Sequence, residues 1–198
     1  NKVDIKSCEN IFIVGMHRSG TTLVESIISM NKDVYDLGDM DILGESFIES
    51  KKIDQELNLA DLYLRKVNDL REEFKIVTNK HTYNYQFSGV IANQIPNAKI
   101  IHCFRNPLDN ILSIYRTSFT GQEYFSSLID CARVYLDQEE IMRKYKNSFR
   151  SKIYDLNYDL LVRQPNQEIK DLISWLGWEC LDSYLTPHLN PRSVSTAS

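Results

Sequence analysis

The sequence predicts an α/β fold in three layers, with a central parallel sheet flanked by helices. Three observations predict it: short unbroken apolar runs, amphipathic stretches of helical period between them, and a glycine turn directly after the first run. Strands buried on both faces read as continuous apolar runs, and strands that alternate with helices pair in parallel through right-handed crossovers. Ligands in such sheets bind at the carboxyl ends of the strands, so we examine the residues that follow each strand.

The expected strands are short and rich in isoleucine, valine and leucine. They are residues 11–14, 75–78, 99–104 and 153–156. The expected helices carry apolar residues at three- and four-residue spacing. They are residues 21–30, 54–74, 84–95, a helix from Pro107, residues 123–146 and residues 164–176. Proline suits the first turn of a helix, and Gly177 suits the end of the last one because glycine adopts the left-handed conformation easily.

The composition is that of an ordinary folded domain. The chain has 198 residues, of which 42% are hydrophobic and 25% are charged, and we expect one domain. The net charge of −4 argues against a general attraction to nucleic acid, so an anionic ligand needs a local site. No run reaches the ~18 apolar residues of a membrane helix, and residues 1–30 lack the order of a signal peptide, so we expect a cytoplasmic protein.

The four cysteines lie far apart in the sequence, at Cys8, Cys103, Cys131 and Cys180. No pair has the spacing of zinc ligands, and nothing in the chain indicates secretion, so we expect free, buried thiols. The four histidines form no metal set with them. His102 lies within an expected strand, where we expect it to be buried and hydrogen-bonded.

A glycine loop joins the first strand to the first helix. Residues 15–22 read GMHRSGTT, with Gly15 and Gly20 at the spacing of a phosphate-binding loop. Successive backbone N–H groups and the N-terminus of the following helix attract an anion. A nucleotide triphosphatase has lysine directly after the second glycine, whereas this chain has Thr21 there and a cation inside the loop, Arg18. The loop therefore predicts a P-loop-like fold with a phosphate site, and it disfavours ATP hydrolysis with Mg²⁺.

A second candidate anion site follows the strand at residues 99–104. Arg105 comes directly after this strand, and Ser113 lies eight residues later on the next helix. The planar guanidinium suits phosphate oxygens, and the serine hydroxyl adds a donor. Seen alone, Arg105 is equally well explained as a surface ion-pair partner.

Together the two segments resemble the sulfotransferases that use 3′-phosphoadenosine 5′-phosphosulfate (PAPS). FIVGMHRSGTTLVESII resembles their 5′-phosphosulfate loop, and IIHCFRNPLDNILSIYR resembles their 3′-phosphate motif. The most similar variants are those of tyrosylprotein sulfotransferases and of bacterial sulfotransferase domains attached to tetratricopeptide repeats, although this sequence contains no such repeat. The resemblance runs from about Asn10 to the C-terminus and is weakest across residues 46–74.

The resemblance implies that PAPS is the cofactor, that 3′,5′-adenosine bisphosphate (PAP) is its product, and that no metal is required. The residues implied for the 5′-phosphosulfate site are Arg18, Ser19, Gly20, Thr21 and Thr22. Those implied for the 3′-phosphate site are Arg105 and Ser113. The stretch LNYDLLVRQP resembles a further family segment that places Tyr158 against the adenine, and an ordinary core tyrosine at a strand end is the alternative.

The catalytic residues that the resemblance implies are Arg18, Lys80 and Asp39. Lys80 belongs to an Asn-Lys pair that resembles an Asp-Lys pair of the family. The resemblance implies that Lys80 lies near the sulfuryl group and the leaving phosphate. The alternative is that Lys80 is a solvated surface lysine. Asp39 stands where the family commonly has glutamate, and a carboxylate suits a general base because the acceptor hydroxyl must lose its proton. Aspartate is one methylene shorter, so the alternative bases are Asp41, Glu45 and His17.

Three positions depart from the family pattern. His17 stands where the family has proline, His81 where it has an apolar residue, and Thr82 where it has proline. We interpret the changes at residues 81 and 82 as a loop that is reshaped for a different acceptor. The acceptor carries a hydroxyl or an amine, its identity is unknown, and its pocket is expected in residues 36–60 and 117–127. Dimers occur in the resembling families, which leaves a homodimer open.

Two other functions stay open, a P-loop kinase that uses a nucleoside triphosphate and a non-catalytic nucleotide-binding relative. The C-terminal stretch PRSVSTAS resembles the start of a family segment that continues with further cofactor contacts, and Arg192 within it is a further candidate for the anion site. We therefore expect residues 1–198 to form a single sulfotransferase domain that is truncated at its C-terminus relative to the family.

Overall fold

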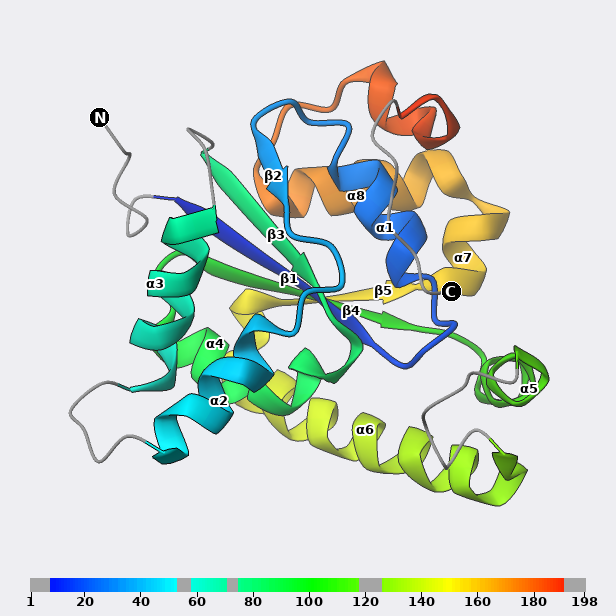
Figure 1. Cartoon of the computed structure of the whole chain (residues 1–198). Coiled ribbons are helices and arrows are strands. Elements are labelled where there is room, and N and C mark those ends of the chain that lie inside the picture. Colours follow the sequence, from blue (N-terminus) through cyan, green and yellow to red (C-terminus); the bar gives the residue numbers. More distant parts are fainter. Residues whose placement is uncertain (1–7, 53–57, 71–74, 118–125, 191–198) are drawn as a thin grey trace.

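A computed structural model describes residues 8–52, 58–70, 75–117 and 126–190, and they form a parallel sheet between two layers of helices (Figure 1). The sheet has five strands in the order β2-β3-β1-β4-β5, and every neighbouring pair is parallel. The strands are β1 (Glu9–Gly15), β2 (Val34–Asp36), β3 (Ile76–Lys80), β4 (Ala98–Phe104) and β5 (Ile153–Asn157). The predicted fold class is confirmed.

The α-helices cover both faces of this sheet. They are α1 (Thr21–Ile28), α2 (Ile42–Lys52), α3 (Leu59–Leu70), α4 (Ser88–Gln94), α5 (Pro107–Thr117), α6 (Leu128–Phe149), α7 (Tyr158–Arg163) and α8 (Pro165–Leu176). Helices α1, α7 and α8 lie on one face, and α2, α3, α4 and α6 lie on the other (Figure 1). Short 3₁₀ helices are η2 (Thr82–Phe87), η4 (Arg150–Lys152), η5 (Asp182–Leu185) and η6 (Pro187–Leu189).

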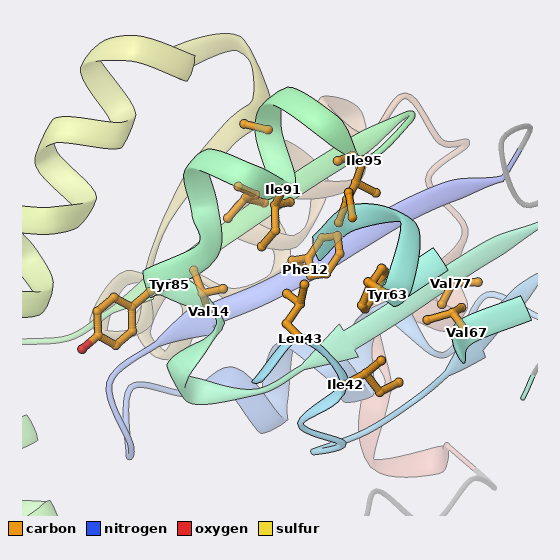
Figure 2. Packing of buried hydrophobic residues seen from close by; sticks show 14 of the residues in the cluster. Phe12, Val14, Ile42, Leu43, Tyr63, Val67, Val77, Tyr85, Ile91 and Ile95 are labelled. Carbon is orange, nitrogen blue, oxygen red and sulfur yellow. The ribbon is translucent and has the colours of Figure 1, made fainter. Parts of the chain in front are cut away.

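Each face of the sheet has its own hydrophobic core. On one face, Phe12 of β1 packs against Tyr63 of α3 with the two ring centroids 5.4 Å apart, and Leu43 and Ile91 surround them (Figure 2). On the other face, Ile11 and Ile13 of the same strand lie in a second cluster with residues of α1 and α8. Because successive side chains of a strand point to opposite faces, the unbroken apolar run of β1 supplies both cores.

Three elements were not predicted from the sequence. Strand β2 has only three residues, which is too short to show a period, and α7 has only six. Helix α2 carries exposed Phe47 and Ile48 among charged residues, which obscures its apolar face. The predicted helix at 84–95 is wrong in its first part: the chain forms the 3₁₀ helix η2 before α4, and Asn84 there donates a hydrogen bond from Nδ2 to Asn79 Oδ1 (2.7 Å).

Two predicted helices lie partly outside the described residues. Within the prediction at 54–74, the structure shows α3 at Leu59–Leu70; residues 54–57 and 71–74 are not described. Within the prediction at 123–146, helix α6 begins at Leu128 and continues to Phe149, and Ser127 caps it by accepting a hydrogen bond from the Asp130 N–H (3.3 Å). Serine at this position explains where the helix begins, because its hydroxyl satisfies a first-turn donor.

The cysteine prediction holds for burial at three of the four positions. All four thiols are free, and Cys8, Cys103 and Cys131 are buried. The prediction is wrong for Cys180, which is exposed because it follows α8 in the segment before η5. His102 is fully buried as predicted, between Gln138 of α6 (2.8 Å) and Asp155 of β5 (3.2 Å).

Among the described residues, no helix is both long enough and apolar enough to cross a membrane. In the same part of the chain, no group of three or more His, Cys, Asp or Glu side chains has an arrangement that could hold a metal ion.

The end of α8 provides a test of the local structure. Gly177 ends this helix with φ of 78°, and no heavy atom lies within 4 Å of a Cβ added there. We expect Gly177→Ala to lower the free energy of unfolding by about 1 kcal/mol, because only backbone strain opposes it. Gly177→Asn should cost less, since asparagine tolerates this conformation. Urea unfolding monitored by tryptophan fluorescence measures both, and equal stability of the alanine variant and the wild type would contradict the expectation.

Candidate functional site

The candidate site lies where the five strands end. The glycine loop follows β1, Asp39 follows β2, Lys80 is the last residue of β3, Arg105 follows β4, and Tyr158 follows β5. Since all five strands are parallel, their carboxyl ends meet at one edge of the sheet (Figure 1). In the order of the sheet, β1 lies between β3 and β4, so the loop is flanked by Lys80 on one side and Arg105 on the other. This is the position where open α/β sheets bind ligands.

The glycine loop is held in shape by its own hydrogen bonds. Ser19 is fully buried, and both its hydroxyl (2.7 Å) and its N–H (3.2 Å) donate to the Met16 carbonyl. Gly20 adopts the left-handed conformation with φ of 94°, and Arg18 also has a positive φ of 65°. In this structure Ser19 is therefore engaged with the loop itself, while its predicted contact with a cofactor remains a prediction.

Helix α1 begins directly after this loop and presents its N-terminus at the strand edge. Its N-cap is Gly20, and no side chain caps the helix. The first-turn N–H groups of a helix attract anions, because they lack intrahelical partners and stand at the positive end of the helix dipole. Thr21 and Thr22 add hydroxyl groups in this first turn, and both are half-buried. The position of the loop at this N-terminus is compatible with a phosphate site, and binding of a phosphate there remains a prediction.

The loop and α5 are joined by side-chain hydrogen bonds. Arg18 Nε donates to Ser113 Oγ (3.3 Å), so the structure brings together a residue from each of the two predicted anion sites. Asn110, fully buried on α5, donates from Nδ2 to the backbone carbonyl of His17 (3.0 Å). Two neighbouring loop residues are therefore tied to the helix that carries Ser113.

Arg105 lies against Tyr158 on the other side of the loop. The Arg105 guanidinium lies over the Tyr158 ring, with 5.0 Å from Cζ to the ring centroid. The same ring packs so closely on Gly20 that an added Cβ would stand 2.2 Å from Tyr158 Cδ2. Only glycine leaves room for this contact. Tyr158 thus joins the loop to Arg105, and whether it also contacts an adenine remains a prediction.

Lys80 is buried between two carboxyl groups. Its Nζ lies 2.7 Å from Asp39 Oδ2 and 3.4 Å from Glu25 Oε2. The side chains of Lys80 and Glu25 are 4% and 1% exposed, whereas that of Asp39 is 40% exposed. Asp39 is therefore the carboxylate of this cluster that solvent or a substrate can reach. The alternative reading of Lys80 as a solvated surface lysine is wrong.

The other candidate bases have different environments. Asp41 accepts a hydrogen bond from the Gly44 N–H (3.1 Å) at the start of α2, and Glu45 forms an ion pair with Lys66 (3.4 Å). Burial, with the nearby His81 adding to the effect, lowers the pKa of His17 to about 4. A group with so low a pKa is a weak proton acceptor, which disfavours His17 as the general base.

Glu25 is a site residue that was not predicted from the sequence. Burial raises its pKa to about 9, and the neighbouring Asp36 adds to the shift by repulsion. The available signal was an acidic residue on the apolar side of α1, beside Val24 and Ile28, because carboxyl groups are rarely buried without a specific partner. Asn110 was missed for a similar reason, as a polar residue on the buried side of α5 with Ile114.

Some predicted residues lie outside the described structure. Arg192 and the acceptor-pocket residues 118–125 are among them, as are residues 53–57. Within the described part of the predicted pocket, α2 and its preceding turn expose Met40, Phe47 and Ile48. These positions are compatible with an apolar surface beside the site, but their contact with an acceptor remains a prediction.

Comparison with known proteins identifies the family. Residues 45–182, well over half of the chain, match the model of the "Sulfotransferase family". The chain belongs to the sulfotransferase family. An uncharacterized protein of Aquifex aeolicus (strain VF5) is 30% identical to the chain in an alignment that covers 95% of the chain but 28% of that relative. The chain thus spans little more than a quarter of the relative's length.

Solved sulfotransferase structures share the fold. A sulfotransferase domain from the curacin biosynthetic pathway aligns with 100% of the chain and 82% of its own length, at 16% identity and a TM-score of 0.69. The domain of the Synechococcus PCC 7002 olefin synthase covers 95% of the chain and 80% of its own length, at 16% identity and a TM-score of 0.66. Mouse SULT7A1 complexed with PAP covers 90% of the chain and 62% of its own length, at 18% identity and a TM-score of 0.63.

The buried carboxyl of Glu25 predicts a pH dependence of stability. Near pH 8 the folded chain keeps this proton, because the folded pKa is about 9, whereas the unfolded chain has lost it at its ordinary pKa of 4.5. The folded state therefore binds more protons, and each rise of one pH unit lowers the free energy of unfolding by about 1.4 kcal/mol through this group. His17 does not contribute there, since above its ordinary pKa of 6.5 it is neutral in both states.

Urea unfolding between about pH 7 and 8.5 measures this slope in the wild type and in Glu25→Gln. The glutamine variant should lack it. The control Glu140→Gln changes an exposed carboxylate whose pKa is lowered by Arg143, so it should keep the wild-type slope. Equal slopes in the wild type and Glu25→Gln would show that Glu25 is ionised in the folded chain.

Proposed function

We propose that the chain transfers a sulfuryl group from PAPS to a hydroxyl or amine of an acceptor. The observation that carries this proposal is the convergence of Arg18, Lys80 and Arg105 around the uncapped N-terminus of α1. These three cations come from different strand ends, in a chain whose net charge is −4. Such a local concentration of positive charge suits a nucleotide with anionic groups at two positions. Membership of the sulfotransferase family supports PAPS as that nucleotide, and so does the PAP complex of the mouse relative.

In this proposal the two phosphate-bearing ends of the donor bind to two parts of the site. The loop, with Arg18, Gly20, Thr21 and Thr22, holds the 5′-phosphosulfate at the N-terminus of α1, where first-turn N–H groups attract an anion. Arg105 and Ser113 hold the 3′-phosphate. Arg105 is suited to this role because its Nε is buried and makes no hydrogen bond among the described residues; its ion-pair partner, Asp159 Oδ1, lies 4.0 Å away. A buried guanidinium N–H without a hydrogen bond is costly, and an anion would satisfy it.

The reaction follows from the groups at the strand ends. The acceptor oxygen or nitrogen forms a bond to sulfur while the bond between sulfur and the bridging phosphate oxygen breaks. Lys80, Arg18 and the loop amides stabilise the negative charge that develops on the departing phosphate. Asp39 accepts the proton of the acceptor, since it is the exposed carboxylate beside Lys80. Positioning and fixed charge supply most of the catalysis, as they do in phosphoryl transfer.

The first test concerns nucleotide binding. We expect calorimetry to show binding of PAP, and Arg105→Ala to weaken it ~10–100-fold through loss of charge-assisted hydrogen bonds. The control Arg133→Ala removes a guanidinium that pairs with Asp130 on the surface of α6, and it should bind PAP normally. Unchanged affinity in Arg105→Ala would remove Arg105 from the 3′-phosphate site. Tighter binding of Mg²⁺–ATP than of PAP would instead support a kinase.

The second test concerns the general base. Asp39→Asn should lower kcat ~100–10,000-fold without weakening PAP binding, because the base acts on the acceptor and not on the nucleotide. The assay follows sulfate transfer from PAPS to a panel of phenols, sugars and amines. Asp41→Asn and Glu45→Gln are matched controls, since both carboxylates are engaged with α2 or α3. If Asp39→Asn keeps full activity while one control loses it, the base is the other carboxylate. Binding of PAP without transfer to any acceptor would favour a non-catalytic relative.

A further inference from the structure

Glu25 stands in the interior between the glycine loop and Lys80, and the proposed reaction assigns it no task. It lies on the first full turn of α1, four residues after Thr21, and its side chain is 1% exposed. Neither carboxyl oxygen accepts a hydrogen bond from a donor of the described residues, and the carboxyl of Asp36 is the group to which a protonated Glu25 can donate. Its charged neighbours are Asp36 and Lys80, and 3.4 Å separates Oε2 from the Lys80 Nζ. A buried carboxyl in this position calls for a specific role, because its burial opposes folding.

We propose that Glu25 is a positioning residue, which holds Lys80 Nζ beside the glycine loop and thereby sets where Lys80 meets the leaving phosphate. This inference rests on the proposed function, and it adds to it a residue that acts through Lys80.

The donors of Lys80 support this role. An ammonium group has three N–H donors. One points to Asp39 Oδ2 at 2.7 Å, and Glu25 Oε2 lies near a second at 3.4 Å. One donor is thus directed to Asp39, and Glu25 Oε2 lies close to Nζ without a hydrogen bond, so a donor is left for an anion at the loop. Without Glu25, a single contact with Asp39 would orient the ammonium, and the flexible lysine chain would lose its fixed position.

The same carboxyl lies beside the turn that places Asp39. Asp36, the charged neighbour of Glu25 from β2, accepts hydrogen bonds at Oδ1 from the Gly38 N–H (2.7 Å) and from Thr78 Oγ1 (3.4 Å). The Gly38 carbonyl in turn accepts from the Lys80 N–H (3.0 Å). Glu25 therefore faces both the lysine and the turn that carries the proposed base.

The charge of Glu25 matters for an anionic donor. The charged groups that act on it are Asp36 and Asp39 from the β2 end and Lys80 from β3. If Glu25 were ionised, two carboxylates would lie within 3.4 Å of the Lys80 ammonium, and the added negative charge would oppose binding of a phosphate. Burial and Asp36 raise the pKa of Glu25 to about 9, so near neutral pH it is a neutral group. A neutral carboxyl can still accept from Lys80 while it leaves the positive charge to the donor.

The decisive experiment is a double-mutant cycle between Glu25 and Lys80. It measures PAP affinity by calorimetry and the release of sulfate from PAPS, with water as the acceptor. The variants are Glu25→Leu, Lys80→Met and the double variant. We expect each single variant to lower kcat ~10–100-fold, and the double variant to be no worse than Lys80→Met, because Glu25 acts through Lys80. Glu25→Gln should stay within ~3-fold of the wild type, since glutamine reproduces a neutral carboxyl.

A pH series and a control variant separate positioning from a general effect on folding. Above about pH 9 the wild type should bind PAP more weakly than Glu25→Gln, because ionisation of Glu25 adds a negative charge beside Lys80. The control Gln138→Leu removes another buried polar side chain, one that belongs to α6 and is distant from Lys80 in the sequence. It should keep the wild-type kcat.

Three results would overturn the inference. Glu25→Leu could be as active as the wild type, the effects of Glu25→Leu and Lys80→Met could multiply, or Glu25→Gln could lose as much activity as Glu25→Leu. Each of these leaves the proposed function intact, provided that the wild type binds PAP and releases sulfate. A wild type that does not bind PAP at all would instead overturn the proposed function, and the role of Glu25 with it.

Discussion

The parallel register of β1 with its two neighbours is the constraint on which the candidate site depends. Ile13 of β1 pairs with Lys80 of β3, and Gly15 pairs with Cys103 of β4. These pairings bring the glycine loop, the last residue of β3 and the residue after β4 to one edge of the sheet. A shift of one residue in the pairing would turn every side chain of a strand to the opposite face, so Lys80 would no longer face Asp39 and Glu25. The apolar side chains of β1 oppose such a shift, because both hydrophobic cores depend on them.

Several charged side chains of the candidate site are buried or half-buried, and each is stabilised by a neighbouring group that offsets the cost of its burial. Lys80 is almost fully buried, and such an ammonium is tolerated where carboxyl groups stand close to it. Arg105 is oriented by the Tyr158 ring, and its backbone carbonyl accepts a hydrogen bond from the Tyr135 hydroxyl (3.1 Å). Met16 of the loop packs in the same small cluster as Tyr135 and Ile114. The α5–α6 pair thus fixes the glycine loop and Arg105 together, although they are far apart in the sequence.

Much of the fold was predictable, and the exceptions have physical causes. Short runs rich in isoleucine, valine and leucine identified β1, β3, β4 and β5, and the run is unbroken in β1, which is buried on both faces. Strand β2 was missed because its three residues pair along one edge of β3 and carry little pattern of their own. At the candidate site, the family resemblance singled out Lys80, Asp39, Arg105 and Tyr158, and the structure places all four at or just after strand ends. Glu25, Asn110 and Tyr135 were missed because they belong to helices, where a lone polar residue shows its contacts only after the helices are packed.

The sequence by itself determined the alternation of strands and helices, the glycine turn after the first strand, and the residues that end each strand. These are local properties, set by apolar period, by glycine positions and by the chemistry of single side chains. Tertiary structure alone decided that Lys80 is buried against Asp39 and Glu25, that Arg18 meets Ser113, and that Cys180 is exposed. Such contacts join residues that are distant in the chain, and their geometry exists only once the five strands have paired in register.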